Sequence, residues 1–179
     1  MEISKQVYGY RKCARTSGRL LELCDAERPL PPIEYATHGV WIDLPSQLRD
    51  CLEGKGVAYA RGGLHAAEHL AISLAPLCAT CEPFDLGCQC TRRVGDEHGE
   101  RFLLFERRRG GVGISAALLA GLEEIFQAAL ARLESCECEH GCLSCIYMHG
   151  CGDYNEGLDK AAACAILRWL ILGPPTSPK

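Results

Sequence analysis

Residues 136–151 read Cys136-Glu-Cys-Glu-His-Gly-Cys-Leu-Ser-Cys-Ile-Tyr-Met-His-Gly-Cys151, so five cysteines lie within sixteen residues. Their spacing is C-x-C-x3-C-x2-C-x5-C. Zinc takes four soft ligands in a tetrahedron, and closely spaced cysteines let a short segment wrap around one ion. Gly141 and Gly150 each precede a cysteine and permit the tight backbone that such a wrap needs. The stretch therefore predicts a structural zinc site, with disulfides as the alternative.

Five cysteines compete for the four positions of this zinc site. We expect the ligands to be four of the following five residues: Cys136, Cys138, Cys142, Cys145 and Cys151. His140 and His149 are also near, but thiolates outcompete imidazole when enough of them are present. A site of four thiolates has no open coordination position, so we expect a structural role and assign no catalytic residue.

The cysteine stretch lies between two predicted helices. Residues 114–133 place apolar side chains at helical spacing, and residues 158–172 form a second apolar run that ends before Gly173-Pro174. A metal ion between them would fix their relative angle. Structural zinc contributes about 10–16 kcal/mol in small peptides, which is comparable with the net stability of a domain.

The remainder of the chain mixes short strands with helices. Strands are predicted around residues 7–10, 20–23 and 37–44, a helix over 64–75, and a buried strand over 101–106, whereas residues 46–60 are ambiguous. The predicted fold class is α/β (α+β). It consists of a β-rich segment (1–45), a mixed α/β domain (46–175) with the four-cysteine zinc knuckle between its two C-terminal helices, and a disordered tail (176–179).

Composition narrows the classes of protein. The 179 residues are 47% hydrophobic, which suffices for a core, and they include 13 cysteines. We find no apolar run of about 18 residues and no secretory signal, so we expect no membrane span and an intracellular protein, nuclear if eukaryotic and cytoplasmic if bacterial. Reduced cysteines favour metal over disulfides. A net charge of −4 means that any nucleic-acid contact needs a local basic patch.

One such patch is Arg107-Arg108-Arg109-Gly110-Gly111, between the predicted strand and the helix that follows. A helix N-terminus exposes backbone N–H groups that suit a phosphate, and arginines add charge. We therefore predict a nucleic-acid contact here, with a solvated strand-to-helix turn as the alternative. The patch is not a nucleotide P-loop, because no G-x4-G-K-[ST] occurs in the chain.

Two further motifs could carry chemistry. His65-Ala-Ala-Glu68-His69 spells H-x-x-E-H on a predicted helix, so a small zinc hydrolase is one alternative function and an ordinary helix face is the other. A possible second metal site, or else a set of small buried hydrophobes, is formed by Cys78, Cys81, Cys88 and Cys90.

The order of these motifs resembles the C-terminal zinc-binding domain of MrfA-type, mitomycin-repair, superfamily-two DEAD/DEAH-box helicases. The matching segments are Gly63–Ile72, Leu77–Cys81, Asp85, Gly110–Ile114, Cys136–Cys145, Cys151-Gly152 and Asn155–Lys160, with Val7–Tyr10 and Pro31–Thr37 upstream. The chain departs from the family at Arg107–Arg109 and at Gly87-Cys88.

The resemblance implies a zinc-binding tail of an ATP-dependent 3′–5′ DNA-repair helicase, with zinc held by four of the matching cysteines. In the family, two RecA-like motor domains hydrolyse ATP, and this chain carries no Walker motif for them. As an isolated chain it is therefore expected not to be an enzyme. The implied partners are helicase motor domains, in cis or as a separate protein, and DNA. A zinc-organised protein–protein interaction module remains the other alternative.

Overall fold

The computed structural model describes residues 1–28, 30–53, 57–88 and 101–173. The strands are β1 (Glu2–Lys5), β2 (Gly9–Cys13), β3 (Leu20–Asp25), β4 (Ile33–Ala36), β5 (Gly39–Asp43), β6 (Leu86–Cys88) and β7 (Arg101–Glu106). The helices are α1 (Ser46–Glu53), α2 (Val57–Leu74), α3 (Ile114–Ala120), α4 (Leu122–Ser135) and α5 (Lys160–Leu172), with 3₁₀ turns η1 (Ala75–Leu77) and η2 (Pro83–Asp85). The mixed α/β class predicted from the sequence is confirmed.

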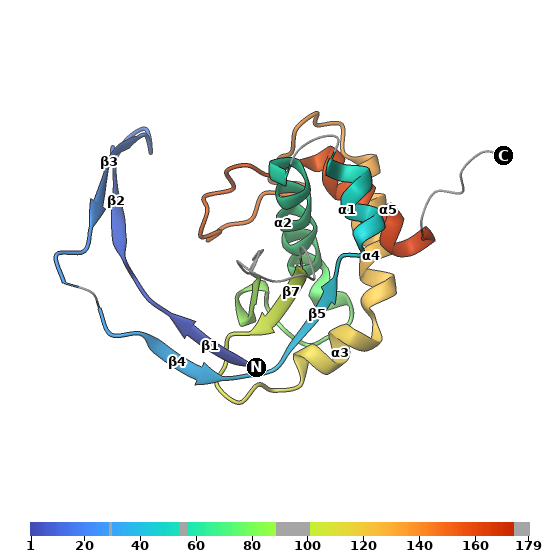
Figure 1. Ribbon diagram of the computed structural model, residues 1–179, viewed down its shortest axis with the longest axis horizontal. Coiled ribbons are helices and arrows are strands. Elements are labelled where there is room, and N and C mark those ends of the chain that lie inside the picture. Colours follow the sequence, from blue (N-terminus) through green and yellow to red (C-terminus); the bar gives the residue numbers. More distant parts are fainter. Residues whose placement is uncertain (29, 54–56, 89–100, 174–179) are drawn as a thin grey trace.

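The N-terminal strands form a bent arm that extends to one side of the helices (Figure 1). β1 pairs antiparallel with β4, and β2 pairs antiparallel with β3. β5 instead joins the main sheet, whose order is β5-β7-β6 and whose pairs are antiparallel. The last strand of the predicted β-rich segment is thus a structural part of the body.

The centre of the body is α2, which packs against α5, α4 and β7. Its residues Leu64, Ala67, Leu70 and Ala71 are fully buried, as the periodicity of the sequence indicates. Next to them, a Cβ on Gly63 would collide with the Cβ of Ala162 in α5. The closest approach of α2 to α5 therefore requires a residue without a side chain.

The prediction of one continuous helix over residues 114–133 is wrong, because the structure has two helices there. The chain breaks at Gly121 into α3 and α4, whose axes are bent by 74°. Each part still buries its apolar face, because Leu118 and Ile125 on either side of the break are fully buried. An isolated glycine inside a helical pattern lowers helix propensity, so the break falls at the weakest position.

Within the described part of the chain, no single helix has the length and apolar content to cross a membrane. Only α3 and α4 taken together reach both, and they do so across their bend.

Candidate metal centre

Four cysteine sulfurs meet just beyond the C-terminal end of α4. The Sγ atoms of Cys136 and Cys138 are 3.5 Å apart, and those of Cys142 and Cys145 are 3.7 Å apart. Across these pairs, Cys136 is 3.6 Å from Cys142, and Cys138 is 3.4 Å from Cys145. Four sulfurs at about 2.3 Å from a tetrahedral zinc ion are about 3.8 Å apart. The cluster is therefore positioned to bind a metal ion of this kind.

The backbone around the cluster is shaped to bring the sulfurs together. Gly141 has φ +128°, and a Cβ there would collide with the Ile146 side chain. The N–H groups of Cys145 and Tyr147 both donate to the carbonyl of Cys142, which closes a tight turn. The N–H of Cys142 donates to the Cys145 sulfur at 3.3 Å, a contact that stabilises a thiolate.

The cluster is tied to the last helix by Lys160. Its Nζ donates to the carbonyl oxygens of Cys136 and Cys138, at 2.6 Å each. Lys160 is the first residue of α5, and the Asp159 carboxylate caps that helix by accepting from the N–H of Ala162 at 2.8 Å. Sequence reasoning missed the role of Lys160; it occurs only as the last residue of the Asn155–Lys160 motif.

The four sulfurs differ in how readily they ionise. A hydrogen bond from the backbone of Ser144 lowers the pKa of Cys142 to about 6, whereas burial raises the pKa of Cys145 to about 12. All four can be thiolates together only if a cation compensates their charge. Zinc meets this requirement because it is a dication that binds thiolate ligands.

Cys151, the fifth cysteine, lies outside this cluster. Its Sγ is 3.6 Å from Nε2 of His65 in α2, and the residue is buried. His140 is exposed beside Glu139, and His149 lies edge-on to Phe84. Neither histidine belongs to a ligand group in the described part of the chain.

The glutamate of the H-x-x-E-H motif is held by β6 and β7, where its side chain contacts Cys88 and Leu103. Glu68 is fully buried, and its Oε1 accepts from the N–H of Leu103 in β7 at 2.9 Å. Burial raises the pKa of Glu68 to about 8. The two histidines lie one turn apart in α2 with ring centroids 4.4 Å apart, and they line a hollow of about 300 Å³ that Glu68 does not line. A hydrolase would need this glutamate beside the metal-bound water, so the geometry does not favour that alternative.

The three described cysteines of the possible second site, Cys78, Cys81 and Cys88, do not form one ligand group. The Sγ of Cys78 donates to the carbonyl of Gly121 at 3.6 Å, and Cys81 belongs to no ligand group among the described residues. Cys88 lies with His65 and His69 instead. Cys90 lies outside the described residues.

The premise that α3 offers free N–H groups to a phosphate is wrong. The carboxylate of Glu106 already accepts from the N–H groups of Val112 and Ser115 at the start of this helix. Burial acts to raise the pKa of Glu106, but these N–H donors hold it below the ordinary value. The side chains of Arg107, Arg108 and Arg109 are exposed, and Arg109 donates to the carbonyl of Glu34 at 3.2 Å. A nucleic-acid contact by this segment, including Gly110 and Gly111, stays a prediction that now depends on the arginines alone.

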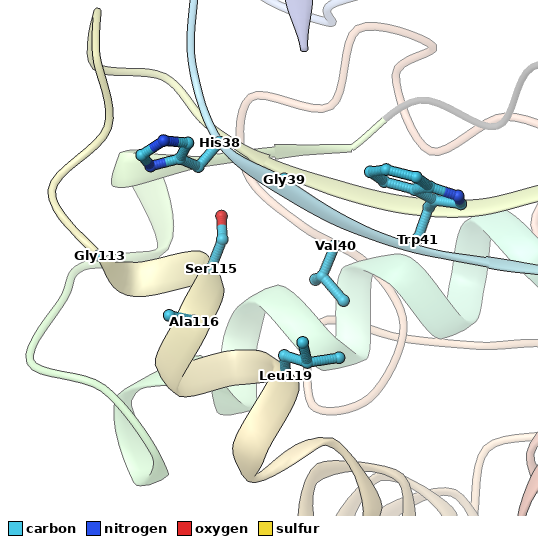
Figure 2. Close-up of a pocket in the computed structure, with 8 residues that line it drawn as sticks. All are labelled: His38, Gly39, Val40, Trp41, Gly113, Ser115, Ala116 and Leu119. Atoms are coloured by element: carbon cyan, nitrogen blue, oxygen red, sulfur yellow. The ribbon is translucent and has the colours of Figure 1, made fainter.

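A separate hollow of about 550 Å³ lies between β5 and α3 (Figure 2). Val40, Trp41 and Leu119 give it a mostly apolar lining, and His38 and Ser115 stand at one end. Because it offers so few polar groups, it has no metal-binding chemistry.

Comparison with known proteins places the cysteine cluster in a family. The family described as the MrfA Zn-binding domain matches residues 67–146. An uncharacterized protein of Methanocaldococcus jannaschii, MJ1572.1, is 30% identical over 119 residues, which are 60% of this chain and 99% of that protein. The ATP-dependent helicase HRQ1 of Saccharomyces cerevisiae is 22% identical over 175 residues, which are 92% of this chain but only 16% of the helicase.

The fold of this chain also matches part of a solved helicase structure. A crystal structure of the DUF1998 helicase MrfA bound to DNA matches with a TM-score of 0.55 and 17% identity. The match covers 94% of this chain and 22% of that one. This chain thus shares its fold with a part of that helicase and spans a small fraction of the length of the helicases that it matches.

Proposed function

We propose, because the chain belongs to the MrfA Zn-binding domain family, that it is a zinc-stabilised accessory domain of a DNA-repair helicase and supports binding to nucleic acid. The observation that carries this proposal is the set of four sulfurs, with separations of 3.4–3.7 Å, between α4 and α5. In the proposal Cys136, Cys138, Cys142 and Cys145 hold one zinc ion, and Cys151 does not.

The metal acts on the architecture and not on a substrate. Four thiolates close the coordination shell, so no position remains for water or substrate. The ion joins the end of α4 to the turn after it, and Lys160 carries that link to α5. Both helices pack on each other and on α2, so the ion fixes the part of the body that a motor domain would use as a rigid support.

ATP hydrolysis belongs elsewhere in this proposal. The 179 residues contain no P-loop signature, and the helicases that the chain matches are several times longer. The motor is therefore supplied by other domains, in the same protein or in a partner.

Contact with nucleic acid is proposed through the exposed arginines at 107–109. Four thiolates on one zinc dication leave a net charge of about −2, and Glu137 and Glu139 flank them, so the cysteine turn repels phosphates. The arginine segment follows the end of β7 that is opposite to Arg101, and Arg109 there contacts the arm residue Glu34.

The test measures zinc and DNA binding together. Zinc per chain is determined by elemental analysis, and the affinity for a single-stranded oligonucleotide is measured by fluorescence anisotropy across a salt series. Each phosphate contact that is lost reduces the slope of log K against log salt by about 0.7 for single strands, so the triple variant Arg107→Ala/Arg108→Ala/Arg109→Ala should reduce it by up to about 2.

A control variant with the same change in net charge is Arg15→Ala/Arg19→Ala/Arg28→Ala in the arm, and its slope should stay as in the wild type. An unchanged slope in the 107–109 variant removes this segment from the interface. Zinc binding without any DNA binding at low salt would instead favour a zinc-organised protein–protein module.

A further inference from the structure

Three side chains with metal-ligating atoms meet outside the four-cysteine cluster. The atoms offered by His65, His69 and Cys88 all lie within 4.8 Å of one another. The two histidines are one turn apart on α2, and Cys88 ends strand β6, which packs on that helix. Ligand atoms around a tetrahedral zinc ion are about 3.4–3.6 Å apart for these atom types, so shifts of about 1 Å would bring these three atoms around one ion.

His69 is already oriented as a ligand. Its Nδ1 lies 2.8 Å from the carbonyl oxygen of Ile146, which can only accept, so Nδ1 carries the proton and donates. The lone pair is then on Nε2, and this atom is buried without a hydrogen-bond partner in the described residues. The histidine as a whole is 2% exposed. A metal-bound histidine commonly donates its other ring N–H to a carbonyl in this way, and an orphaned buried nitrogen otherwise costs free energy.

His65 shows a related arrangement with a different partner. Its Nε2 faces the Cys151 sulfur at 3.6 Å, while its Nδ1 faces the Asp153 carboxylate at 4.0 Å. Cys151, which the four-sulfur cluster leaves out, contacts His65 and is the sulfur next to the group of three, although it lies outside the 4.8 Å limit that the three share.

The surroundings allow an ion to enter. The hollow of about 300 Å³ is lined by both histidines, Cys88 and Cys151. Arg61 and Arg107 line it too, and their charge opposes a bare cation held by neutral ligands. Two thiolate ligands would neutralise a bound dication and so offset this opposition.

From this geometry we propose a second metal site, formed by His65, His69 and Cys88 with Cys151 as the fourth ligand, for a borderline-soft divalent ion of the zinc type. The site joins α2 to β6 and to the loop before α5. Two imidazoles and two thiolates select zinc or cobalt over calcium and magnesium, which prefer oxygen. The inference is independent of the proposed function, because it uses none of the ligands of the first centre.

The test is a count of metal per chain in the full-length protein, purified under reducing conditions and analysed by elemental analysis. Wild type should hold two zinc ions. His65→Ala and Cys88→Ser should each hold about one, while the matched variants His149→Ala and Cys81→Ser should keep two. Cys142→Ser should lose the other ion and keep the one at His65, which separates the two centres.

A second measurement uses the wild-type protein, so it still counts the metal sites if a variant fails to fold. Wild type is stripped of metal and titrated with Co²⁺, which reports thiolate ligands through their charge-transfer absorption. The titration should reach two equivalents, with weaker charge transfer per ion at the histidine-containing site, which has fewer sulfurs. One equivalent at saturation, or a second ion that persists in Cys88→Ser and His65→Ala, would overturn the second site and leave the proposed function intact. No bound metal in either experiment would overturn both.

Discussion

The substitution Glu106→Gln tests the interaction that closes the start of α3. Glu106 is fully buried, and its two carboxylate oxygens accept from the backbone N–H groups of Val112 and Ser115. Glutamine has nearly the same shape but offers one acceptor oxygen, and its amide N–H₂ must face an N–H donor. The substitution therefore removes one charge-assisted hydrogen bond and leaves a buried donor without an acceptor.

The expected loss follows from the two contacts. A hydrogen bond to a charged group contributes about 1.5–3 kcal/mol, and the attraction of a carboxylate to a helix N-terminus adds a few tenths to about 1 kcal/mol. We expect Glu106→Gln to lower the free energy of unfolding by about 2–4 kcal/mol. For a chain of this length, such a loss lowers Tm by about 4–16 °C.

The assay is chemical denaturation of both proteins at a series of pH values, followed by circular dichroism. Because the folded pKa of Glu106 lies below its ordinary value of 4.5, its charge stabilises the fold above that pH and ceases to do so as pH falls through the folded pKa. The difference between wild type and Glu106→Gln should be constant near neutrality and shrink below pH 4.5. Acid also protonates the cysteine cluster, but it does so in both proteins, so the difference isolates Glu106.

The exposed residue Glu27 provides the control, since Glu27→Gln makes the same chemical change away from any helix start and should leave stability unchanged within about 0.5 kcal/mol. If Glu106→Gln costs no more than this control at neutral pH, or if its cost grows as the solution is acidified, the role given to the Glu106 carboxylate is wrong.

Two other predictions concern the metal centre and the helix packing. Cys142→Ser should lose one zinc per chain, as judged by elemental analysis, and should destabilise the C-terminal third by several kcal/mol, as judged by urea unfolding. The reason is that structural zinc contributes about 10–16 kcal/mol in small peptides. A variant that keeps its zinc and its Tm contradicts the assignment. Gly63→Ala should destabilise by about 1–3 kcal/mol in the same unfolding assay, because the new methyl group meets Ala162 of α5. Gly152→Ala, whose Cβ would meet no atom within 4 Å, is its control, and equal stability of the two variants would show that α2 and α5 do not approach so closely.

Periodicity and composition predict the elements with a strong local signal. The apolar run Phe102–Phe105 forms the centre of β7, and the spacing of buried residues in α2 and α5 is visible in the sequence. The break at Gly121 is less visible, because the apolar pattern continues through it and only the 74° bend reveals that the two parts pack differently. Local patterns indicate which face is buried but not which partner covers it.

The role of Glu106 shows why the N–H groups at the start of α3 are not open to a phosphate. Sequence reasoning placed three arginines before a helix and inferred N–H groups available to a phosphate. The residue that takes those N–H groups is the acid directly before the arginines, and it can do so only because the glycines at 110, 111 and 113, all with positive φ, turn the chain back over it. An acidic residue followed by a glycine-rich turn and a helix is the signal that could have indicated this cap.

The cysteines show the same limit at the scale of the whole fold. Spacing alone groups Cys88 with Cys90, and Cys151 with the four cysteines before it, since neighbours in sequence are the simplest candidates for one ion. Folding regroups them, because β6 and the loop before α5 both lie against α2 and bring Cys88 and Cys151 to His65. Residues 136–151 therefore contribute to two groups of side chains. Four of their sulfurs form one cluster. The carbonyl of Ile146 contacts His69 of α2, and the sulfur of Cys151 contacts His65 of α2. Because the two groups share no ligand, loss of Cys88 should leave the four-sulfur cluster intact.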